Sequence, residues 1–350
     1  MKTVKFLVYS KWKEIVTGGH KYDNDLFKII DSLSNYEVKE VEIGCHDHTS
    51  KLLKPFKELM NGIKAGKADL IIFNSSKCLR FMGVMIWLKL FRRQQVYSIH
   101  HHFIHLEFKG IKKQIYKLAE NMFLRLSDKI IIPSPYIYSI LQKKRKPEDL
   151  LLWRIPFETR QEYKPTPIIG NLTFAGTIEP RKGLIYLMKS LKILQENNID
   201  YRLKILGKVI DNNYYGQLEK FIAENNLNVE FMGFVSKDEK NRILSETDIF
   251  VFPSLLEGFG MVLVEAQVYA LPIVCFNNSS MPFSVKENEN GFLVPTGAYK
   301  DMAAKIKVII TDRELRLRLS DGALENVRNQ NTFKKFEETV IDFFKYKFTD

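Results

Sequence analysis

The sequence predicts an α/β fold with two domains, and three observations support this prediction. The chain has 350 residues, which is enough for two domains that each bury a core of their own. Short apolar runs typical of buried parallel strands recur along it, with helical segments between them. Near the middle, residues 155–167 contain three prolines and mixed charges, a composition typical of a linker between domains.

The first half alternates between strands and helices, and each strand is a short apolar run bounded by polar residues. The run LIIF within 69–74 is apolar throughout, which indicates a strand covered on both faces. The elements we expect are a strand at 4–9, a loop at 10–20, a helix at 25–33, strands at 37–43 and 69–74, a helix at 79–93, and strands at 96–102 and 129–133.

The second half continues this alternation and ends in a segment with phenylalanines at helical spacing. Phe333, Phe336, Val340, Phe343 and Phe344 recur on one side, which predicts an amphipathic final helix. The elements we expect are strands at 172–175, 201–206, 229–231, 249–252, 272–276 and 291–295, and helices at 238–245, 261–269, 313–329 and 332–348. The predicted domains are 1–155 and 170–330, with a linker at 156–169 and a last segment at 331–350.

Composition and cysteine usage are those of an ordinary globular protein, with 45% hydrophobic residues. Cys45, Cys78 and Cys275 are scattered and form no Cys-x-x-Cys pair, so we expect a reducing cytoplasm. The first apolar run, 6–9, is too short for a signal peptide. The most apolar segment, 81–91, falls short of the roughly 20 residues of a membrane-spanning helix, so none is expected.

The positive charge is concentrated in the first half of the chain. Residues 1–155 hold 28 Lys+Arg against 15 Asp+Glu, whereas residues 156–350 hold 25 against 26. Such a field attracts nucleic acid, anionic lipid headgroups or phosphorylated acceptors. Because no nucleic-acid-binding module is recognisable, we expect an anionic membrane surface, with a merely solubilising charge as the alternative. The helix at 79–93 and the basic run at 143–146 are candidates for that contact, although core packing explains most of the helix's apolar face.

The stretch 254–272 carries the most distinctive pattern in the chain. Gly258 and Gly260 precede the helix at 261–269, and backbone N–H groups at a helix start bind anions. Glu257 and Glu265 lie on either side of that start, and carboxylates bind sugar hydroxyls well. The combination favours a sugar phosphate or a nucleotide sugar. A strand–turn–helix with solvated acids fits the spacing equally well.

Two further patterns lie near the chain's beginning. Gly18 and Gly19 follow the first strand, where glycines let the backbone approach a ligand closely, although an ordinary tight turn also explains them. Asp23-Asn24-Asp25 has the form of a metal-binding Asp-x-Asp motif. We interpret these aspartates instead as caps of the helix that follows.

The expected strand at 96–102 ends in three histidines, and His105 follows it. His100 comes where a parallel strand ends, at the sheet edge where α/β proteins bind ligands. Zinc is an alternative, since His101 and His105 would share a face of a helix, but no Glu or Cys completes a site. A sugar contact at His100 is the favoured interpretation. The sequence His46-Asp47-His48 is interpreted as a surface loop.

Residues 254–274, SLLEGFGMVLVEAQVYALPIV, resemble the donor-site signature of retaining glycosyltransferases with the GT-B fold, in particular family four. That signature is a Glu, seven residues and a second Glu, with Gly-Phe-Gly after the first. Ala270 stands where the family usually has Gly, and we expect a small cost because alanine is nearly as small. Residues 176–183, GTIEPRKG, are similar to the family's Gly-Arg and Arg-Lys-Gly motif: Lys182 matches, and Thr177 replaces the usual Arg.

The resemblance implies a GT-B fold of two Rossmann-like β/α/β domains facing a central cleft, with the last helix crossing back to the first domain. It implies retaining transfer of a hexose from a nucleoside-diphosphate sugar to a cell-surface glycan or lipid-linked acceptor, in bacterial polysaccharide or lipopolysaccharide assembly. No metal and no other cofactor are expected, and no nucleic acid partner. The expected location is the cytoplasm, peripheral on the inner face of the membrane. The alternatives are a UDP-sugar 2-epimerase and a catalytically weak nucleotide-sugar-binding subunit.

The resemblance also implies roles for individual residues. Lys182 would neutralise the donor diphosphate, with Arg181 either compensating for the missing Arg or facing solvent. Glu257 and His100 would contact the donor sugar, and Glu265 the ribose hydroxyls. The full set of expected donor-site residues is Gly18, Gly19, Arg181, Lys182, Phe234, Val235, Glu257, Gly258, Phe259, Gly260, Met261, Val262 and Glu265, with Phe234 and Val235 contacting the base.

Overall fold

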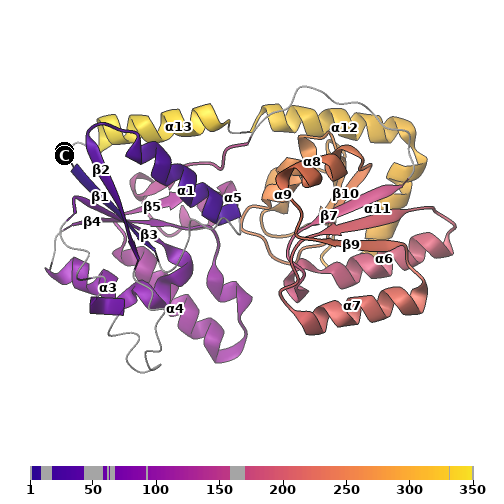
Figure 1. Ribbon diagram of the computed structural model, residues 1–350, viewed down its shortest axis with the longest axis horizontal. Coiled ribbons are helices and arrows are strands. Elements are labelled where there is room, and N and C mark those ends of the chain that lie inside the picture. The colour runs from indigo at the N-terminus through magenta and orange to yellow at the C-terminus, as the bar shows by residue number, and fades with distance from the viewer. Residues whose placement is uncertain are drawn as a thin grey trace. The chain divides into compact units, whose positions relative to one another are not determined.

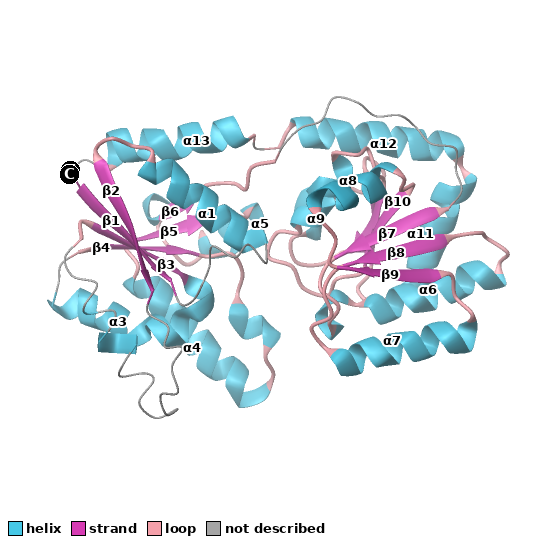
Figure 2. Ribbon diagram, in the orientation of Figure 1, coloured by secondary structure: helices cyan, strands magenta, loops and turns pink. Residues whose placement is uncertain are grey.

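The computed structural model describes residues 2–8, 18–42, 58–60, 63, 68–91, 94–157, 170–330 and 332–348. Cys45, the His46–His48 motif, Arg92, Arg93 and most of the expected linker lie outside these residues. The chain divides into two compact units, each an α/β assembly (Figure 1 and Figure 2). Unit 1 comprises Met1–Pro156 and Phe333–Asp350, and unit 2 comprises Phe157–Thr332.

Unit 1 is built on a parallel sheet that is six-stranded in the described residues, with strand order β2-β1-β3-β4-β5-β6. The inner strands β3, β4 and β5 are buried along nearly their whole length, as their largely apolar runs predict. The strands are β1 (Lys2–Val8), β2 (Tyr36–Glu42), β3 (Leu70–Asn74), β4 (Gln95–Ile99), β5 (Lys129–Ile132) and β6 (Leu150–Leu152).

The helices of unit 1 pack their apolar faces on this sheet. From α3 and α4, Phe81, Met85 and Phe123 meet Phe73 and Ile71 of β3 in one buried cluster. The helices are α1 (Gly18–Asp31), α3 (Cys78–Phe91), α4 (Gly110–Leu126), α5 (Pro135–Leu141) and α13 (Phe333–Asp342). No helix in the described ranges is both long and apolar enough to cross a membrane.

Helix α1 begins at Gly18, seven residues before the expected start at 25. Tyr22, Leu26, Ile29 and Ile30 are all buried, and their spacing continues the helical periodicity back to Tyr22. The expectation of a loop reaching to residue 20 was therefore wrong. The two glycines favoured the prediction of a loop. A helix can nevertheless begin at them, because the N–H groups of a first turn have no partner within the helix.

The end of the chain completes the core of unit 1. Phe336 of α13 is fully buried and packs on Tyr22 of α1, with ring centroids 5.2 Å apart. A π-helical turn follows α13, Phe343–Lys347, and Phe344 meets Tyr36 edge to face at 5.3 Å. The Tyr36 hydroxyl donates a hydrogen bond to the Phe344 carbonyl at 2.7 Å. A segment more than 300 positions away in the chain thus covers α1 and β2.

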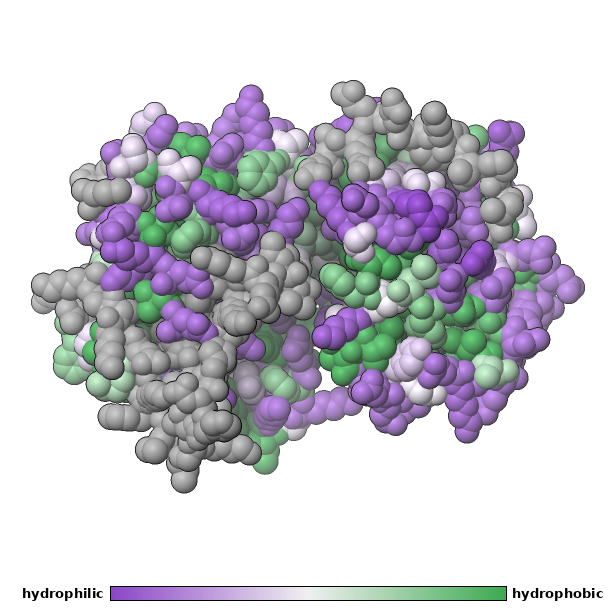
Figure 3. Space-filling model, in the orientation of Figure 1, coloured by the Kyte–Doolittle hydropathy of each residue, from purple (hydrophilic) through white to green (hydrophobic). Residues whose placement is uncertain are grey.

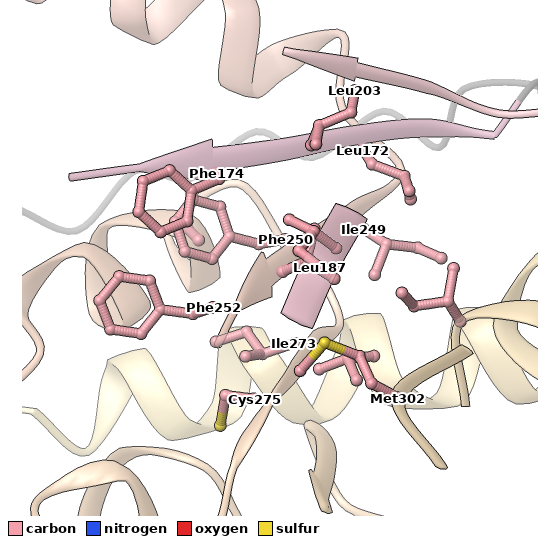
Figure 4. Packing of buried hydrophobic residues seen from close by; sticks show 14 of the residues in the cluster. Leu172, Phe174, Leu187, Leu203, Ile249, Phe250, Phe252, Ile273, Cys275 and Met302 are labelled. Atoms are coloured by element: carbon pink, nitrogen blue, oxygen red, sulfur yellow. The ribbon is translucent and has the colours of Figure 1, made fainter. Parts of the chain in front are cut away.

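Unit 2 is built on a second parallel sheet, again six-stranded in the described residues, with order β12-β11-β10-β7-β8-β9. In its core Phe174, Phe250 and Phe252 of two neighbouring strands pack against Leu187 of α6 and Met302 of α11 (Figure 4). The strands are β7 (Asn171–Ala175), β8 (Arg202–Leu206), β9 (Val229–Gly233), β10 (Ile249–Phe252), β11 (Ile273–Phe276) and β12 (Gly291–Val294). The prediction of an α/β fold with two parallel sheets is confirmed.

Several helices of unit 2 begin with the capping residues that their sequences favour. Asp211, Ser236 and Asp312 accept a hydrogen bond from the backbone N–H three positions on, at 2.9, 3.1 and 2.9 Å. The helices are α6 (Leu184–Glu196), α7 (Asn212–Asn225), α8 (Lys237–Ser245), α9 (Met261–Gln267), α10 (Met281–Ser284), α11 (Tyr299–Thr311) and α12 (Arg313–Arg328). The charged exposed surface of α8 stands out in the space-filling view (Figure 3).

Ala270 stands where the family usually has glycine, and the expectation about its cost considered only the size of the side chain. Its φ is +57°, in the left-handed region, and its side chain is fully buried just after α9. A glycine adopts this conformation freely, whereas alanine is strained by about 1 kcal/mol or more. The cost of the departure thus comes from the backbone angle and not from the size of the side chain.

Candidate active site

In unit 2 the candidate residues gather where β7 and β10 end. These strands are neighbours in the sheet although far apart in the chain, so the segments after them lie side by side. A 3₁₀ turn, Pro180–Lys182, follows β7 and leads through Gly183 into α6. Gly183 has φ +67°, and a Cβ on it would lie 2.0 Å from the Pro253 carbonyl oxygen. Glycine at this position therefore lets the turn approach the end of β10.

Lys182 and Glu257 form the centre of this cluster. The Lys182 ammonium donates a short hydrogen bond to Glu257 Oε1, and the Ser254 hydroxyl donates to the same oxygen at 2.8 Å. Lys182 Nζ also lies 5.4 Å from the centroid of the Phe252 ring. Both charged side chains are nearly buried, with 11% and 12% of their side-chain surface exposed. A desolvated ion pair of this kind holds both groups in fixed positions.

Arg181 turns toward the same carboxylate. Its guanidinium donates to the Leu256 carbonyl at 2.9 Å and to Glu179 Oε1 at 2.8 Å, and Nη1 lies 3.7 Å from Glu257 Oε1. Thr177, the departure from the family pattern, donates its hydroxyl to that same Glu179 oxygen at 2.7 Å. Of the two alternatives for Arg181, the structure has it within the cluster. Glu179 was missed by sequence reasoning, since nothing in its spacing distinguished it.

The helix after β10 starts where it was expected but is shorter. Gly260 caps α9 with φ +77°, and Met261 and Val262 are its first residues. Gly258 lies in the preceding bend, and Phe259 stacks on Phe157 with centroids 5.7 Å apart. The helix ends at Gln267 and not at the expected 269, because the chain turns there toward the left-handed Ala270.

Two other parts of the expected donor site, on α9 and after β9, make contacts that do not involve Lys182. Glu265 on α9 pairs with Lys240 on α8 at 3.0 Å, and both side chains are about one third exposed. Lys240 was not predicted, because only the packing of α8 beside α9 brings it there. Phe234 follows β9 and is 76% exposed, whereas Val235 packs against the core of the unit.

In unit 1, His100 follows β4 and is completely buried. Its Nδ1 lies 2.7 Å from the Ser75 hydroxyl, and its Nε2 has no hydrogen-bond partner in the described part of the chain. Burial, followed by the neighbouring histidines, lowers the pKa of His100 to about 3, so the imidazole is neutral. When Ser75 donates to Nδ1, Nε2 carries the ring proton and is a free donor.

His101 contacts the carboxylate of Asp23, which the sequence analysis interpreted as a helix cap. Its Nε2 lies 2.8 Å from Asp23 Oδ1, while Asn74 donates to Asp23 Oδ2 at 2.5 Å. Asp23 lies within α1 and is buried, so the interpretation of this aspartate as a helix cap was wrong. Gly18 and Gly19 form the first turn of α1, and a Cβ on Gly19 would lie 3.6 Å from the His101 ring.

The other two histidines each face a different carboxylate. His102 Nε2 lies 3.2 Å from Glu107, and His105 Nδ1 lies 2.5 Å from Glu120. Burial raises the pKa of the Glu120 carboxyl. His105 belongs to the 3₁₀ turn Ile104–Glu107 and His101 precedes it, so the expected shared helical face was wrong. Within the described ranges no group of three or more such side chains is placed to hold a metal ion.

Two family descriptions match most of this chain. Residues 19–154 match Glycosyltransferase Family 4, and residues 164–326 match Glycosyl transferases group 1. The chain belongs to the family 4, group 1 glycosyltransferases. The recognition made from residues 254–274 is therefore confirmed, and the family assignment agrees with the two parallel sheets of the structure.

Curated relatives of this chain include a capsular polysaccharide biosynthesis protein and a protein of a cps region. An uncharacterised glycosyltransferase of Methanocaldococcus jannaschii is 30% identical over 57% of this chain and 54% of its own length. The capsular polysaccharide biosynthesis glycosyltransferase CapM of Staphylococcus aureus is 29% identical over 48% of this chain and 42% of its own. An uncharacterised 41.2 kDa protein in the cps region of Klebsiella pneumoniae is 27% identical over 74% and 76%. The chain thus spans about half the length of the first two.

Solved structures share the fold of this chain at low sequence identity. Sucrose-phosphate synthase from Thermosynechococcus elongatus superposes with a TM-score of 0.82 and 17% identity, covering 99% of both chains. Anabaena HepE, solved in complex with UDP-glucose, gives a TM-score of 0.76 and 16% identity, covering 99% of this chain and all of its own. These likenesses establish the GT-B fold, and the prediction of that fold is confirmed.

Proposed function

We propose that this protein transfers a sugar from a nucleoside-diphosphate sugar to a glycan or lipid-linked acceptor of the bacterial cell surface. The observation that carries the proposal is the cluster of Lys182, Arg181 and Glu257 where β7 and β10 end. It places two cations and a carboxylate together, and the lysine and the carboxylate are nearly buried. A diphosphate needs the cations and a sugar hydroxyl needs the carboxylate.

In the proposed reaction the bond between the sugar's anomeric carbon and the diphosphate breaks, and a bond from that carbon to the acceptor oxygen forms. Negative charge builds up on the leaving diphosphate, where Lys182 and Arg181 would stabilise it. The acceptor proton passes to the leaving phosphate oxygen. We propose attack from the same face as the leaving group, with retention, because no candidate residue is assigned as a nucleophile.

The remaining assignments follow the family pattern and await tests. His100, neutral and with an Nε2 that has no partner among the described residues, suits a hydrogen bond to a hydroxyl of the donor sugar. Glu265 would accept from ribose hydroxyls after exchanging its contact with Lys240. The exposed Phe234 offers a face on which a base stacks. UDP is the first nucleotide to test, since HepE was solved with UDP-glucose. Independence from metal ions stays a prediction.

The cell-surface acceptor is proposed from relatives and from charge. CapM is named for capsular polysaccharide biosynthesis, and the Klebsiella protein lies in a cps region. Residues 1–155 carry an excess of 13 positive charges over the 15 acidic residues there. That excess suits a phosphate-bearing acceptor at an anionic membrane surface on the cytoplasmic side.

A panel of UDP- and GDP-sugars tests the proposal, with released nucleoside diphosphate measured in the presence and absence of membrane extract as acceptor. If the protein transfers the sugar, release of nucleoside diphosphate depends on the acceptor. The anomeric coupling constant of the product, measured by proton NMR, tests retention. Adding a chelator in a parallel series tests independence from metal. Release that never exceeds the rate without protein would overturn the proposal.

The alternatives give different outcomes in the same assay. A 2-epimerase would convert the nucleotide sugar to its isomer without acceptor, which chromatography of the donor detects. The family and relatives are those of glycosyltransferases, so the epimerase is not favoured. A binding subunit would bind the donor in calorimetry yet release no diphosphate. Thr177 motivated that second alternative, and the position of Arg181 in the cluster weighs against it.

A further inference from the structure

Helices α3 and α4 of unit 1 carry apolar side chains on the side that faces away from the core. On α4 these are Ile111, Ile115, Leu118 and Met122, spaced four, three and four residues apart, so they form one stripe along the helix. Ile111 is 80% exposed and Leu118 71%. Soluble monomers expose such apolar side chains singly, and a continuous stripe marks an interaction surface.

Helix α3 repeats the pattern. Leu79, Ile86 and Leu90 are exposed at spacings of seven and four residues, and Phe91 follows at 71% exposure. The opposite sides of both helices are buried in one cluster with β3, so the two exposed stripes belong to the outer face of one packed pair. Hydrophobic surface is visible at the lower edge of unit 1, in the region of α4 (Figure 3). We call the two stripes together the α3–α4 face.

The charges on these helices are almost all positive. Together α3 and α4 contain six lysine and arginine residues, and their one acidic residue, Glu120, is buried against His105. Lys89 is paired with Asp128, and Arg80 lies 3.5 Å from the buried Glu58. The basic residues of the pair are Arg80, Lys89, Lys112, Lys113, Lys117 and Arg125.

We infer that the α3–α4 face is a docking surface that inserts its apolar stripes into the headgroup region of an anionic lipid bilayer. The combination of exposed aliphatic side chains with flanking lysines is the pattern of helices that lie in a membrane interface. A second copy of the chain on this face would bring like charges together, which disfavours self-association. The inference rests on the proposed membrane-bound acceptor for its purpose, and it identifies the surface that makes the attachment.

Vesicle co-sedimentation of the full-length protein tests the inference directly. Vesicles of phosphatidylglycerol with phosphatidylethanolamine should bind the protein, and vesicles of phosphatidylcholine alone should bind it less. Ile111→Ser with Leu118→Ser should weaken binding to the anionic vesicles about tenfold or more, since two buried aliphatic chains are lost. Lys112→Glu with Lys117→Glu should weaken it by a similar factor, and added salt should reduce that difference.

Matched substitutions in unit 2 serve as controls. Val308→Ser on α11 removes an exposed aliphatic side chain, and Lys220→Glu on α7 reverses an exposed charge. Both should bind vesicles like the wild type. Circular dichroism shows whether each variant is folded, and Leu90→Ser on α3 is a second apolar variant if the α4 pair fails to fold.

Three outcomes would overturn the inference: no binding of the wild type to anionic vesicles, unchanged binding of the folded α4 variants, or dimers in sedimentation velocity that the serine substitutions dissociate while vesicle binding persists. Release of nucleoside diphosphate from a soluble donor separates this inference from the proposed function. The α3–α4 variants should keep that release at the wild-type rate. Vesicle binding without any release would count against the proposed function alone.

Discussion

The two units place different chemistry at the same position of the same kind of sheet. After β4 in unit 1, His100 is a neutral imidazole, fully buried, with a hydroxyl on one nitrogen and no described partner on the other. After β7 and β10 in unit 2, Lys182 and Glu257 form an ion pair. The first arrangement offers a nitrogen that suits an uncharged hydroxyl, whereas in the second a ligand would have to replace the internal ion pair. Sheet topology thus fixes where a site forms, and the side chains decide which charge it accepts.

Substitutions in the ionic cluster of unit 2, Lys182 with Arg181 and Glu257, should have the largest effect on sugar transfer. Lys182→Ala removes the cation that is proposed to stabilise the leaving diphosphate, so product formation should fall about a thousandfold. Glu257→Ala should likewise abolish measurable transfer in a protein that still folds, with a lower thermal unfolding midpoint because Lys182 loses its nearly buried partner. The measurement is acceptor-dependent release of nucleoside diphosphate.

A matched lysine separates this role from general charge. Lys204 lies on β8 of the same sheet and pairs with Glu246 at 3.5 Å, outside the cluster. Lys204→Ala should keep wild-type turnover. Full activity in both Lys182→Ala and Glu257→Ala would refute the assignment of the cluster.

The packing around His101 depends on the end of the chain. Phe336 packs on Tyr22, whose ring meets His101 edge to face at 5.6 Å. Phe336→Ala should lower the free energy of unfolding of unit 1 by about 4 kcal/mol, because a fully buried ring is lost. Phe333→Ala, one turn earlier and 43% exposed, should cost under about 1 kcal/mol. Equal midpoints in urea unfolding would show that α13 does not support this unit.

Two glycines with the same φ test whether the turn that carries Lys182 must approach the end of β10 closely. Gly183 and Gly233 both have φ +67°, but a Cβ meets the Pro253 carbonyl at Gly183 and nothing within 4 Å at Gly233. Gly233→Ala should therefore cost about 1 kcal/mol from backbone strain alone. Gly183→Ala should cost about 3 kcal/mol and reduce turnover, since the turn carrying Lys182 must move. Urea unfolding of both variants measures the difference, and equal costs would contradict the close approach.

The smallest expected effect concerns the pH dependence of stability near His100. The unfolded imidazole binds a proton below its ordinary pKa of 6.5, whereas the folded one, with its pKa lowered by burial to about 3, does not. Stability from this group is therefore complete above about pH 6.5 and is lost as the pH falls toward about 3. Between about pH 7 and about pH 5, the free energy of unfolding should fall by about 2 kcal/mol less in His100→Asn than in the wild type.

The measurement is urea unfolding of the variant and of the wild type at each pH. If His100→Asn unfolds with the same pH dependence as the wild type, His100 is not held neutral in the folded protein.

Local patterns in the sequence were sufficient for the fold class and for the residues after β10. Apolar runs of four to five residues predicted the strands, since burial on both faces leaves little choice of side chain. The boundaries that were wrong, at α1 and α9, involve Gly18 and Ala270, where the preference of a residue type disagrees with the conformation that packing imposes.

By itself the sequence determined a two-domain α/β chain that resembles the family four glycosyltransferases, with Glu257 and Glu265 on either side of a helix start. Only the tertiary structure decided which side chains meet: Lys182 with Glu257 because β7 lies beside β10, and Asp23 with His101 because α1 packs over the ends of β3 and β4. Periodicity along a chain reports burial, which is local. Contacts between strand ends depend on strand order, and no pattern within one strand records its neighbour.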